Sequence, residues 1–248
     1  MTIILYDSSS ALPQKAFAPN TWKTRFCLNY KGLPYKTEWV EFESIGIDVY
    51  KKLGLPPSAH SPDGTPSYFL PVIHDTATGV STSDSFAIAE YLEKTYPSPS
   101  LFPNDTSVFQ STVDDTVRDA GIKSLAQFIL ADIYLILNPE SKEYFKRTRE
   151  AAFGKALEDI APKAEEGVAQ WAAVKAGWDT VDSWYVKSGG PFVLGTTISW
   201  ADFSVASWLI WARSVWGEEN QRWKDIATWN NGRWGKVLND LREYQKID

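Results

Sequence analysis

The 248-residue chain has 44% hydrophobic residues, 14 prolines and 15 glycines, the composition of an ordinary globular protein. Its formal charge of −6 argues against a nucleic-acid partner, which would need a strongly basic surface. One cysteine and two histidines exclude a disulfide framework and argue against a Cys/His metal site. We therefore expect no bound metal and a reducing, cytoplasmic environment.

The first predicted elements are strand, helix and strand. Residues 2–6 form a compact apolar run that predicts a strand, and the polar residues 7–10 predict a loop after it. Asn20 is a good N-cap, and apolar residues at helical spacing predict a helix from there to Gly32. Residues 35–42 alternate as a second strand. With neither a basic leader nor a long apolar segment, we expect no signal peptide and no membrane span.

Residues 43–66 form a connection that is unusually long for a compact domain. Its prolines and glycines predict mostly irregular structure, with one or two helical turns around residues 47–53. Loops of this length often carry function, so its polar side chains are candidates for ligand contacts.

The stretch of residues 68–93 reads as strand, turn, strand and helix. Pro71 cannot donate to a sheet ladder, so it must lie at the start, edge or bend of a strand. A turn at residues 75–79 leads to a strand at 80–82, and Asp84 and Ser85 then precede an amphipathic helix. The unpaired N–H groups and dipole of a helix N-terminus favour a carboxylate ligand. The plainer interpretation is that these polar residues only cap the helix.

The combination of Leu70-Pro71 with Asp84-Ser85 at the following helix resembles the glutathione-binding half of the thioredoxin-like domain in glutathione transferases. This resemblance implies a cis peptide before Pro71 and backbone pairing of Leu70 with the cysteinyl part of glutathione. It also implies that Asp84, where many relatives have Glu or Gln, holds the γ-glutamyl end together with Ser85.

The glycyl carboxylate of glutathione would need a cation or a hydrogen-bond donor. The candidates in the long connection are Lys51, Lys52 and His60. Simple solvent exposure is the alternative explanation for each of them.

The second half of the chain contains no convincing strand. Prolines at 97, 99 and 103 mark residues 94–106 as a linker between a thioredoxin-like domain (1–93) and an all-helical domain (107–248). Helices are predicted at residues 107–137, 140–153, 157–187, 199–215 and 219–244. Ser199 and Asp202 form a capping box, which resembles the start of the buried helix in the same family and has a structural role there. The expected fold class is thus α/β plus all-α, the glutathione transferase fold.

Residues 17–25 and the following NYKG resemble the etherase-related classes of glutathione transferase, including the fungal FuA class. By this alignment Ala18 occupies the position of the serine that, in other classes, activates the thiol of glutathione. The remaining catalytic donors are the amide of Asn20, the hydroxyl or backbone N–H of Thr21 and the free N–H groups of the first helical turn. Helix capping is the alternative role of Asn20 and Thr21. Cys27 lies about two turns further along and is expected in the core.

Ten of the twelve tryptophans follow residue 170, and most are expected in the core. Trp216 and Trp223 lie at and beyond the end of the predicted buried helix, where flat aromatic ligands could stack. Together with Phe17 they are the candidate lining of a hydrophobic ligand pocket.

We expect a homodimeric glutathione transferase of modest activity that uses glutathione as co-substrate and acts on hydrophobic aromatic compounds. One alternative is a carrier of polyphenols or similar molecules, with catalysis incidental. Another is a regulatory protein that keeps the fold without glutathione chemistry, although Pro71, Asp84 and Ser85 argue against it.

Overall fold

The computed structural model describes residues 2–61 and 64–248, which divide into two compact units. Unit 1 contains the chain up to Leu101 together with Leu137–Tyr144 and Tyr244–Asp248. Unit 2 contains Phe102–Ile136 and Phe145–Glu243. The division after Leu101 falls within the predicted linker. Leu137–Tyr144 and Tyr244–Asp248 belong to unit 1, although the sequence predicts both segments within the helical domain.

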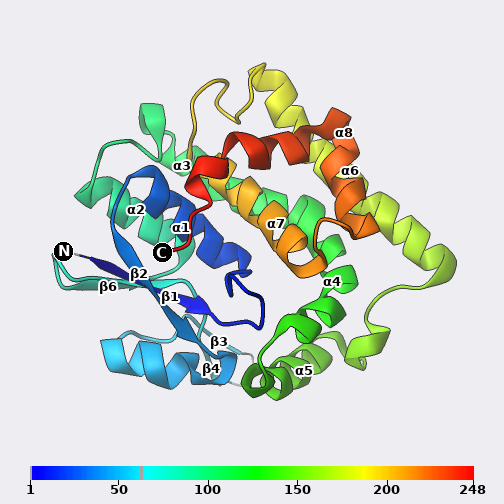
Figure 1. Cartoon of the computed structure of the whole chain (residues 1–248), viewed down its shortest axis with the longest axis horizontal. Coiled ribbons are helices and arrows are strands. Elements are labelled where there is room, and N and C mark those ends of the chain that lie inside the picture. The colour runs from blue at the N-terminus through cyan, green and yellow to red at the C-terminus, as the bar shows by residue number, and fades with distance from the viewer. Residues whose placement is uncertain (1, 62–63) are drawn as a thin grey trace. The chain divides into compact units, whose positions relative to one another are not determined.

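Unit 1 contains a four-stranded mixed sheet with the strand order β2-β1-β5-β6 (Figure 1). The strands are β1 (Ile3–Ser8), β2 (Tyr35–Val40), β5 (Val72–Asp75) and β6 (Val80–Ser83). β1 is parallel to β2 and antiparallel to β5, and β5 is antiparallel to β6. Together with α1 (Pro19–Tyr30) and α2 (Ser85–Thr95), this is the predicted thioredoxin-like arrangement.

Two predicted strand ends differ from the structure. β1 continues to Ser8 because residues 7 and 8 still pair with β2, so the loop starts later than predicted. β2 ends at Val40, two residues earlier than predicted, and the 3₁₀ turn η1 (Phe42–Ser44) follows. Pro71 directly precedes β5, as the missing N–H of proline requires.

Helix α1 begins two residues earlier than the prediction of Asn20 as its N-cap. Its N-cap is Ala18 and its first residue is Pro19, so Asn20 lies within the first turn. Proline is favoured at this position, where its missing N–H costs no hydrogen bond. Cys27 is fully buried, which confirms its assignment to the core, and Gly32 ends the helix with φ of 64°.

The described part of the long connection between β2 and β5 contains more regular structure than the sequence predicts. It contains the π-helical segment η2 (Ile45–Lys51) and a small hairpin of β3 (Ala59–His60) and β4 (Pro66–Ser67). The buried Tyr50 donates its hydroxyl to the carbonyl of Phe69 at 2.6 Å and lies 2.6 Å from the hydroxyl of Ser58. These contacts fix the backbone just before Leu70.

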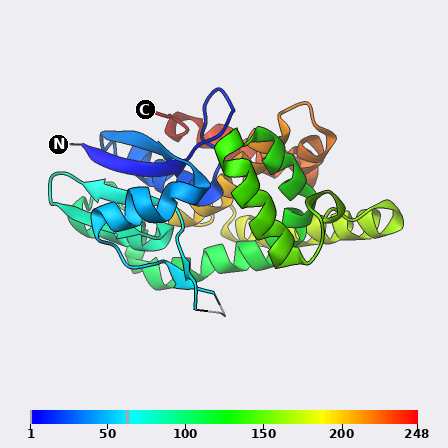
Figure 2. The same ribbon diagram turned by 90° about the horizontal axis from the view of Figure 1, so that it is seen from below.

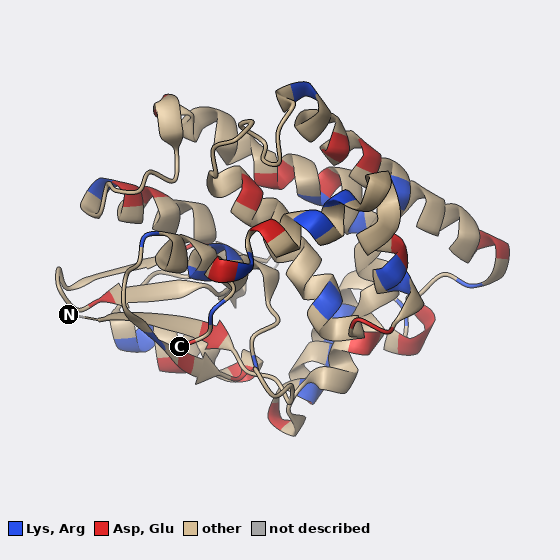
Figure 3. Cartoon of the chain, turned by 45° about the horizontal axis from the view of Figure 1, so that its top comes forward, with Lys and Arg blue, Asp and Glu red and all other residues tan. Residues whose placement is uncertain are grey.

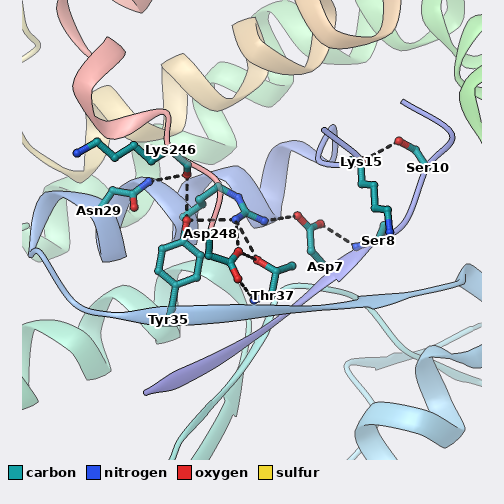
Figure 4. A network of polar contacts seen from close by, with 10 residues as sticks. Asp7, Ser8, Ser10, Lys15, Asn29, Tyr35, Thr37, Lys246 and Asp248 are labelled. Atoms are coloured by element: carbon teal, nitrogen blue, oxygen red, sulfur yellow. Dashed lines mark hydrogen bonds and ion pairs between the residues drawn. The ribbon is translucent and has the colours of Figure 1, made fainter. Parts of the chain in front are cut away.

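The last residues of the chain lie against α1 and β2 within unit 1 (Figure 4). The amide of Asn29 donates to the carbonyls of Tyr244 at 2.7 Å and Lys246 at 2.9 Å. The carboxylate of Asp248 accepts from the backbone N–H of Thr37 at 2.6 Å. The segment thereby pairs with polar groups along β2, the edge strand of the sheet.

Unit 2 is helical, and α5 spans both units. Its elements are η3 (Pro103–Asp105), α3 (Ser107–Val117), η4 (Arg118–Ile122), α4 (Lys123–Ile136), α5 (Pro139–Phe153), η5 (Leu157–Asp159), α6 (Ala164–Ser188), α7 (Trp200–Trp216), α8 (Gln221–Asp240) and η6 (Arg242–Tyr244). α3, η4 and α4 follow one another as the long helical run predicted from the sequence (Figure 2). The predicted helix at 157–187 begins only at Ala164, because Pro162 precedes it.

The capping box at the start of α7 is present in full. The side chain of Ser199 accepts from the N3 backbone, and Asp202 accepts from the backbone N–H of Ser199 at 3.0 Å. Asp202 also accepts from the backbone N–H of Val193 at 2.7 Å. Most of α7 is buried, so the capping box fixes the start of the central helix of unit 2.

Basic and acidic residues are interspersed along the helices of unit 2, and neither kind forms a separate cluster (Figure 3).

Among the described residues, no helix combines the length and apolar character needed to cross a bilayer.

Candidate glutathione site

The candidate site lies in unit 1, where two short segments meet through the pairing of β5 and β6. Val72 pairs with Ser83, so the Leu70-Pro71 peptide before β5 and the Asp84-Ser85 pair after β6 lie at the same end of the two strands. The structure thus brings together four of the residues selected from the sequence. The β5–β6 register accounts for this proximity.

Asp84 is the N-cap of α2 and has an unusual backbone conformation. One carboxylate oxygen, Oδ1, accepts from the N–H groups of Phe86 at 2.9 Å and Ala87 at 3.0 Å. Its φ of 78° and ψ of 129° are rarely adopted by residues other than glycine. Such conformations are more frequent at functional sites, and here the same residue also caps the helix. The second carboxylate oxygen remains available at an exposed position.

Ser85 is the first residue of α2 and is mostly buried. Asp84 already satisfies the N–H groups of the next two residues. Within the described part of the chain, the N–H of Ser85 donates to no acceptor. This group and the Ser85 hydroxyl are therefore the donors that the helix end offers to an anion.

The Leu70-Pro71 peptide bond is cis, as the family resemblance implies. Leu70 lies between β4 and β5, outside both ladders. Among the described residues, none exchanges a hydrogen bond with its backbone. Its N–H and C=O groups can therefore pair with an extended peptide-like ligand in the manner of an added strand.

The start of α1 carries a polar pair that the sequence analysis missed. The fully buried Lys23 donates its ammonium to Oδ1 of the exposed Asn20 at 2.8 Å. Lysine is only a donor, so the contacted atom of Asn20 must be its oxygen, and the amide NH₂ is left as a donor. The spacing of three residues, one helical turn, was the signal that could have identified the pair.

The position of Thr21 corrects one prediction. Its side chain is fully buried and lies beside the carboxyl of Asp7, so the hydroxyl does not face an exposed ligand. Burial raises the pKa of Asp7, although Arg25, Thr21 and the N–H of Ser8 favour its charged form. Thr21 thus retains only its backbone N–H, which belongs to the first turn of α1, as a possible thiol donor.

The candidates for a glycyl carboxylate are all exposed. Lys51 ends η2 and Lys52 follows it, whereas His60 lies in β3 opposite Pro66. Exposure leaves each of them accessible but does not distinguish among them.

The predicted lining of an aromatic pocket is mostly core. Phe17 in unit 1 is 3% exposed and Trp223 in unit 2 is 6% exposed, so both were wrongly expected to present a ring to a ligand. Trp216 is partly exposed, and its indole N–H donates to Asp132 at 2.8 Å. The tryptophan-rich composition of unit 2 therefore largely reflects packing.

Comparison with known proteins identifies both halves of the chain. Residues 17–95 match the glutathione S-transferase N-terminal domain, and residues 108–244 match the glutathione S-transferase C-terminal domain. A glutathione S-transferase-like protein, ustS of Aspergillus flavus, is 32% identical over 92% of this chain and 85% of its own length.

Two solved structures are similar over the whole chain. A glutathione S-transferase of Ceriporiopsis subvermispora, crystallised in complex with glutathione, is 42% identical with a TM-score of 0.94, covering 100% of this chain and 99% of its own. Glutathione transferase GSTFuA3 of Phanerochaete chrysosporium is 38% identical with the same TM-score and coverage. With both domains matched in order and a fungal FuA-class enzyme among its structural relatives, the chain belongs to the glutathione S-transferase family.

Proposed function

We propose that this protein is a glutathione transferase that presents the thiolate of glutathione to hydrophobic aromatic electrophiles. The observation that carries the proposal is the Leu70 backbone, which makes no hydrogen bond with the described residues and lies at the same end of β5 and β6 as the N-terminus of α2. Glutathione is an extended peptide with a carboxylate and an ammonium at its γ-glutamyl end, so it has a complementary group for each part of this site.

The γ-glutamyl end of glutathione would use both residues at the start of α2. Its carboxylate would accept from the N–H and hydroxyl of Ser85, and its ammonium would donate to the second oxygen of Asp84. The first oxygen of Asp84 keeps its two backbone donors, which orients the carboxylate. Hydrogen bonds to charged groups are worth roughly 1.5–3 kcal/mol each.

The cysteinyl part would pair with the backbone of Leu70, whose carbonyl precedes the cis bond to Pro71. The glycyl carboxylate would then be available to His60, Lys51 or Lys52. Among these we assign the role to His60, because β3 pairs with β4, the strand that lies shortly before Leu70 in the chain.

The thiolate would be stabilised at the start of α1. Ala18 has no hydroxyl, so the amide NH₂ of Asn20 and the free N–H groups of the first turn supply the donors. The contact from Lys23 orients the amide and adds a positive charge nearby. A proton lost from the thiol would pass to solvent, and the thiolate would attack the electrophilic carbon and displace its leaving group.

Calorimetry with glutathione and the Ser85→Ala variant tests the binding site. Loss of the hydroxyl should weaken binding about tenfold or more, given the strength of charge-assisted hydrogen bonds. The matched control is Ser81→Ala, which removes a hydroxyl from β6 on the same connection. Unchanged affinity in Ser85→Ala would refute this assignment.

The thiolate assignment is tested by the ultraviolet absorbance of bound glutathione as a function of pH. Asn20→Ala should raise the thiol pKa and lower kcat/KM, with each tenfold loss corresponding to about 1.4 kcal/mol of barrier. Thr21→Val is the control, since it removes a buried hydroxyl that faces Asp7. If Thr21→Val lowered activity and Asn20→Ala did not, the assignment of the donor would be reversed.

A second candidate function is a carrier of hydrophobic molecules with incidental catalysis. The absence of a side-chain hydroxyl at Ala18 favours the carrier, because the classes of this family with a serine at this position use its hydroxyl to activate the thiol. A glutathione-bound protein without measurable turnover on any of several aromatic electrophiles would select this alternative.

We further propose a cytosolic homodimer. A symmetric dimer is the usual form of this family, and the single reduced, buried Cys27 is compatible with a reducing compartment. Light scattering at micromolar concentration should give twice the 27.9 kDa chain mass.

A further inference from the structure

Two side-chain hydroxyls hold the residue that directly precedes Leu70. Tyr50, in η2, donates its hydroxyl to the carbonyl of Phe69 at 2.6 Å. The backbone N–H of Phe69 donates to the hydroxyl oxygen of Ser58 at 2.9 Å, and the two hydroxyl oxygens lie 2.6 Å apart. Both backbone polar groups of Phe69 are thus bonded to side chains and not to a neighbouring strand.

The direction of each of these hydrogen bonds follows from the number of hydrogens available. A tyrosine hydroxyl has one hydrogen, and that of Tyr50 goes to a carbonyl, which can only accept. The hydrogen between the two hydroxyls therefore comes from Ser58. The bonds form a closed circuit from the N–H of Phe69 through Ser58 and Tyr50 to the carbonyl of Phe69. Hydrogen bonds in such a chain polarise and strengthen one another.

The core of unit 1 holds the Tyr50 end of this hydroxyl circuit in place. The side chain of Tyr50 is 1% exposed and belongs to a cluster of buried residues with Val49 and Val72. Its ring centroid lies 5.1 Å from that of Tyr68, and a Cβ atom at Gly46 would lie 2.8 Å from the ring of Tyr68. The η2 backbone thus packs directly on the residue before Phe69, so the hydroxyl of Tyr50 is in position before a ligand arrives.

The carbonyl that Tyr50 binds and the N–H of Leu70 belong to the same peptide group. This peptide is trans, since the cis bonds of the described residues are those before Pro71 and Pro99. In a planar trans peptide the C=O and the N–H point in opposite directions. The hydrogen bond from Tyr50 therefore turns the N–H of Leu70 away from η2, where it donates to none of the described residues.

We propose that Tyr50 and Ser58 are positioning residues for glutathione. Their hydroxyls fix the plane of the peptide between Phe69 and Leu70, so that the N–H of Leu70 is already directed at the cysteinyl carbonyl of the ligand. This inference rests on the proposed function, which pairs the Leu70 backbone with glutathione. Without the circuit this peptide would be ordered only on binding, and the ordering would cost part of the affinity.

Calorimetry with glutathione tests the hydroxyl circuit. Tyr50→Phe and Ser58→Ala should each weaken binding about five- to tenfold, a loss in the range of one neutral hydrogen bond. The double variant should bind about as weakly as either single variant, because each substitution opens the same circuit. Ser58→Thr retains the hydroxyl at an exposed position and should bind as wild type does.

The controls remove hydroxyls from the same connection outside the circuit. Tyr68→Phe removes a hydroxyl that makes no hydrogen bond with the described residues, from the ring beside Tyr50. Ser67→Ala removes a hydroxyl that lies 3.4 Å from that of Ser61. Both variants should keep the wild-type affinity for glutathione.

Steady-state kinetics distinguishes positioning of the ligand from a general loss of structure. In Tyr50→Phe the KM for glutathione should rise by the same factor as the dissociation constant. The kcat at saturating glutathione and the thiol pKa of the bound ligand should stay at their wild-type values, because the circuit holds the cysteinyl backbone and not the sulfur. A loss confined to kcat would overturn the proposal.

Wild-type affinity in both Tyr50→Phe and Ser58→Ala, additive losses in the double variant, or a loss in Ser58→Thr equal to that in Ser58→Ala would also overturn it. If Ser85→Ala weakens binding and the circuit variants do not, the proposed function stands and this inference fails. If the wild type does not bind glutathione, both fail. Should Tyr50→Phe not fold, Ser58→Ala decides the outcome, because Ser58 is exposed.

Discussion

Arg25 and Asp7 form an ion pair of 2.9 Å in which both side chains are fully buried, joining the middle of α1 to the end of β1. The guanidinium also donates to the hydroxyl of Thr37 at 3.1 Å, and it lies 5.5 Å from the ring of Trp22. Burial opposes the charge of Arg25, but the charge interactions and hydrogen bonds with Asp7 and Tyr35 together outweigh it and raise the pKa of Arg25. The pair therefore holds the helix that carries Asn20 against the sheet.

Removing one partner of this pair should strongly destabilise the protein. Arg25→Met leaves the carboxylate of Asp7 buried and unpaired, which typically costs about 3–5 kcal/mol of unfolding free energy. Urea unfolding at neutral pH measures the effect. Lys36→Met is the control, because its pair with Glu38 is exposed and such pairs are worth about 1 kcal/mol or less. Equal losses in the two variants would contradict the structural importance of the buried pair.

Gly177 should tolerate no side chain. A Cβ atom there would lie 1.8 Å from the carbonyl oxygen of Ala120, where α6 packs against η4. Gly177→Ala should therefore lower the unfolding free energy by about 1–3 kcal/mol or more, as overpacking does, even though alanine is the better helix former. Thermal unfolding checks this against Ala176→Gly, which costs about 1 kcal/mol through helix propensity alone. A Gly177→Ala variant more stable than wild type would show that α6 and η4 can move apart at no cost in unfolding free energy.

Asp202 should make stability depend on pH. Burial raises its pKa to about 7, although the N–H groups of Val193 and Ser199 act in the opposite direction. In the unfolded chain an aspartate has a pKa of about 3.9, so between these values only the folded state retains the proton. The stabilising contribution of Asp202 to the unfolding free energy is therefore fully present below about pH 4 and is lost as the pH rises through about 7.

Unfolding free energies measured from pH 4 to pH 8 test this dependence. The decrease in unfolding free energy with rising pH should be smaller in Asp202→Asn, because asparagine cannot titrate. It should be unchanged in Asp119→Asn, because the carboxylate of Asp119 is exposed in the wild type. Identical profiles for wild type and Asp202→Asn would assign the pH dependence to other groups.

Ala18→Ser should increase thiol activation. Ala18 is the N-cap of α1, with φ of −65° and ψ of 121°, a conformation that serine adopts readily at this position. The added hydroxyl should lower the pKa of bound glutathione and raise kcat/KM on a generic aromatic electrophile about tenfold, or about 1.4 kcal/mol of barrier. Ala11→Ser, on the exposed loop before α1, is the control. A wild type as fast as Ala18→Ser would count against the carrier alternative.

The sequence alone determined the parts of the protein that follow local rules. Proline has no N–H, so Pro71 was expected at the start, edge or bend of a strand, and the structure starts β5 directly after it. Ser199 and Asp202 satisfy each other's backbone across one helical turn, so their capping box was readable from spacing. The order of strands and helices along the chain followed from the same short-range patterns, whereas the family followed from a resemblance of motifs.

Only the tertiary structure decided which way the side chains at the site face. Asn20 and Thr21 are neighbours, yet one is exposed and held by Lys23 and the other is buried beside Asp7. Phe17 is an aromatic side chain that the sequence could not separate from a ligand-lining ring, and it is in the core. Local patterns fix where a helix begins, but burial depends on which distant segment packs against each face, and that is set by the whole fold.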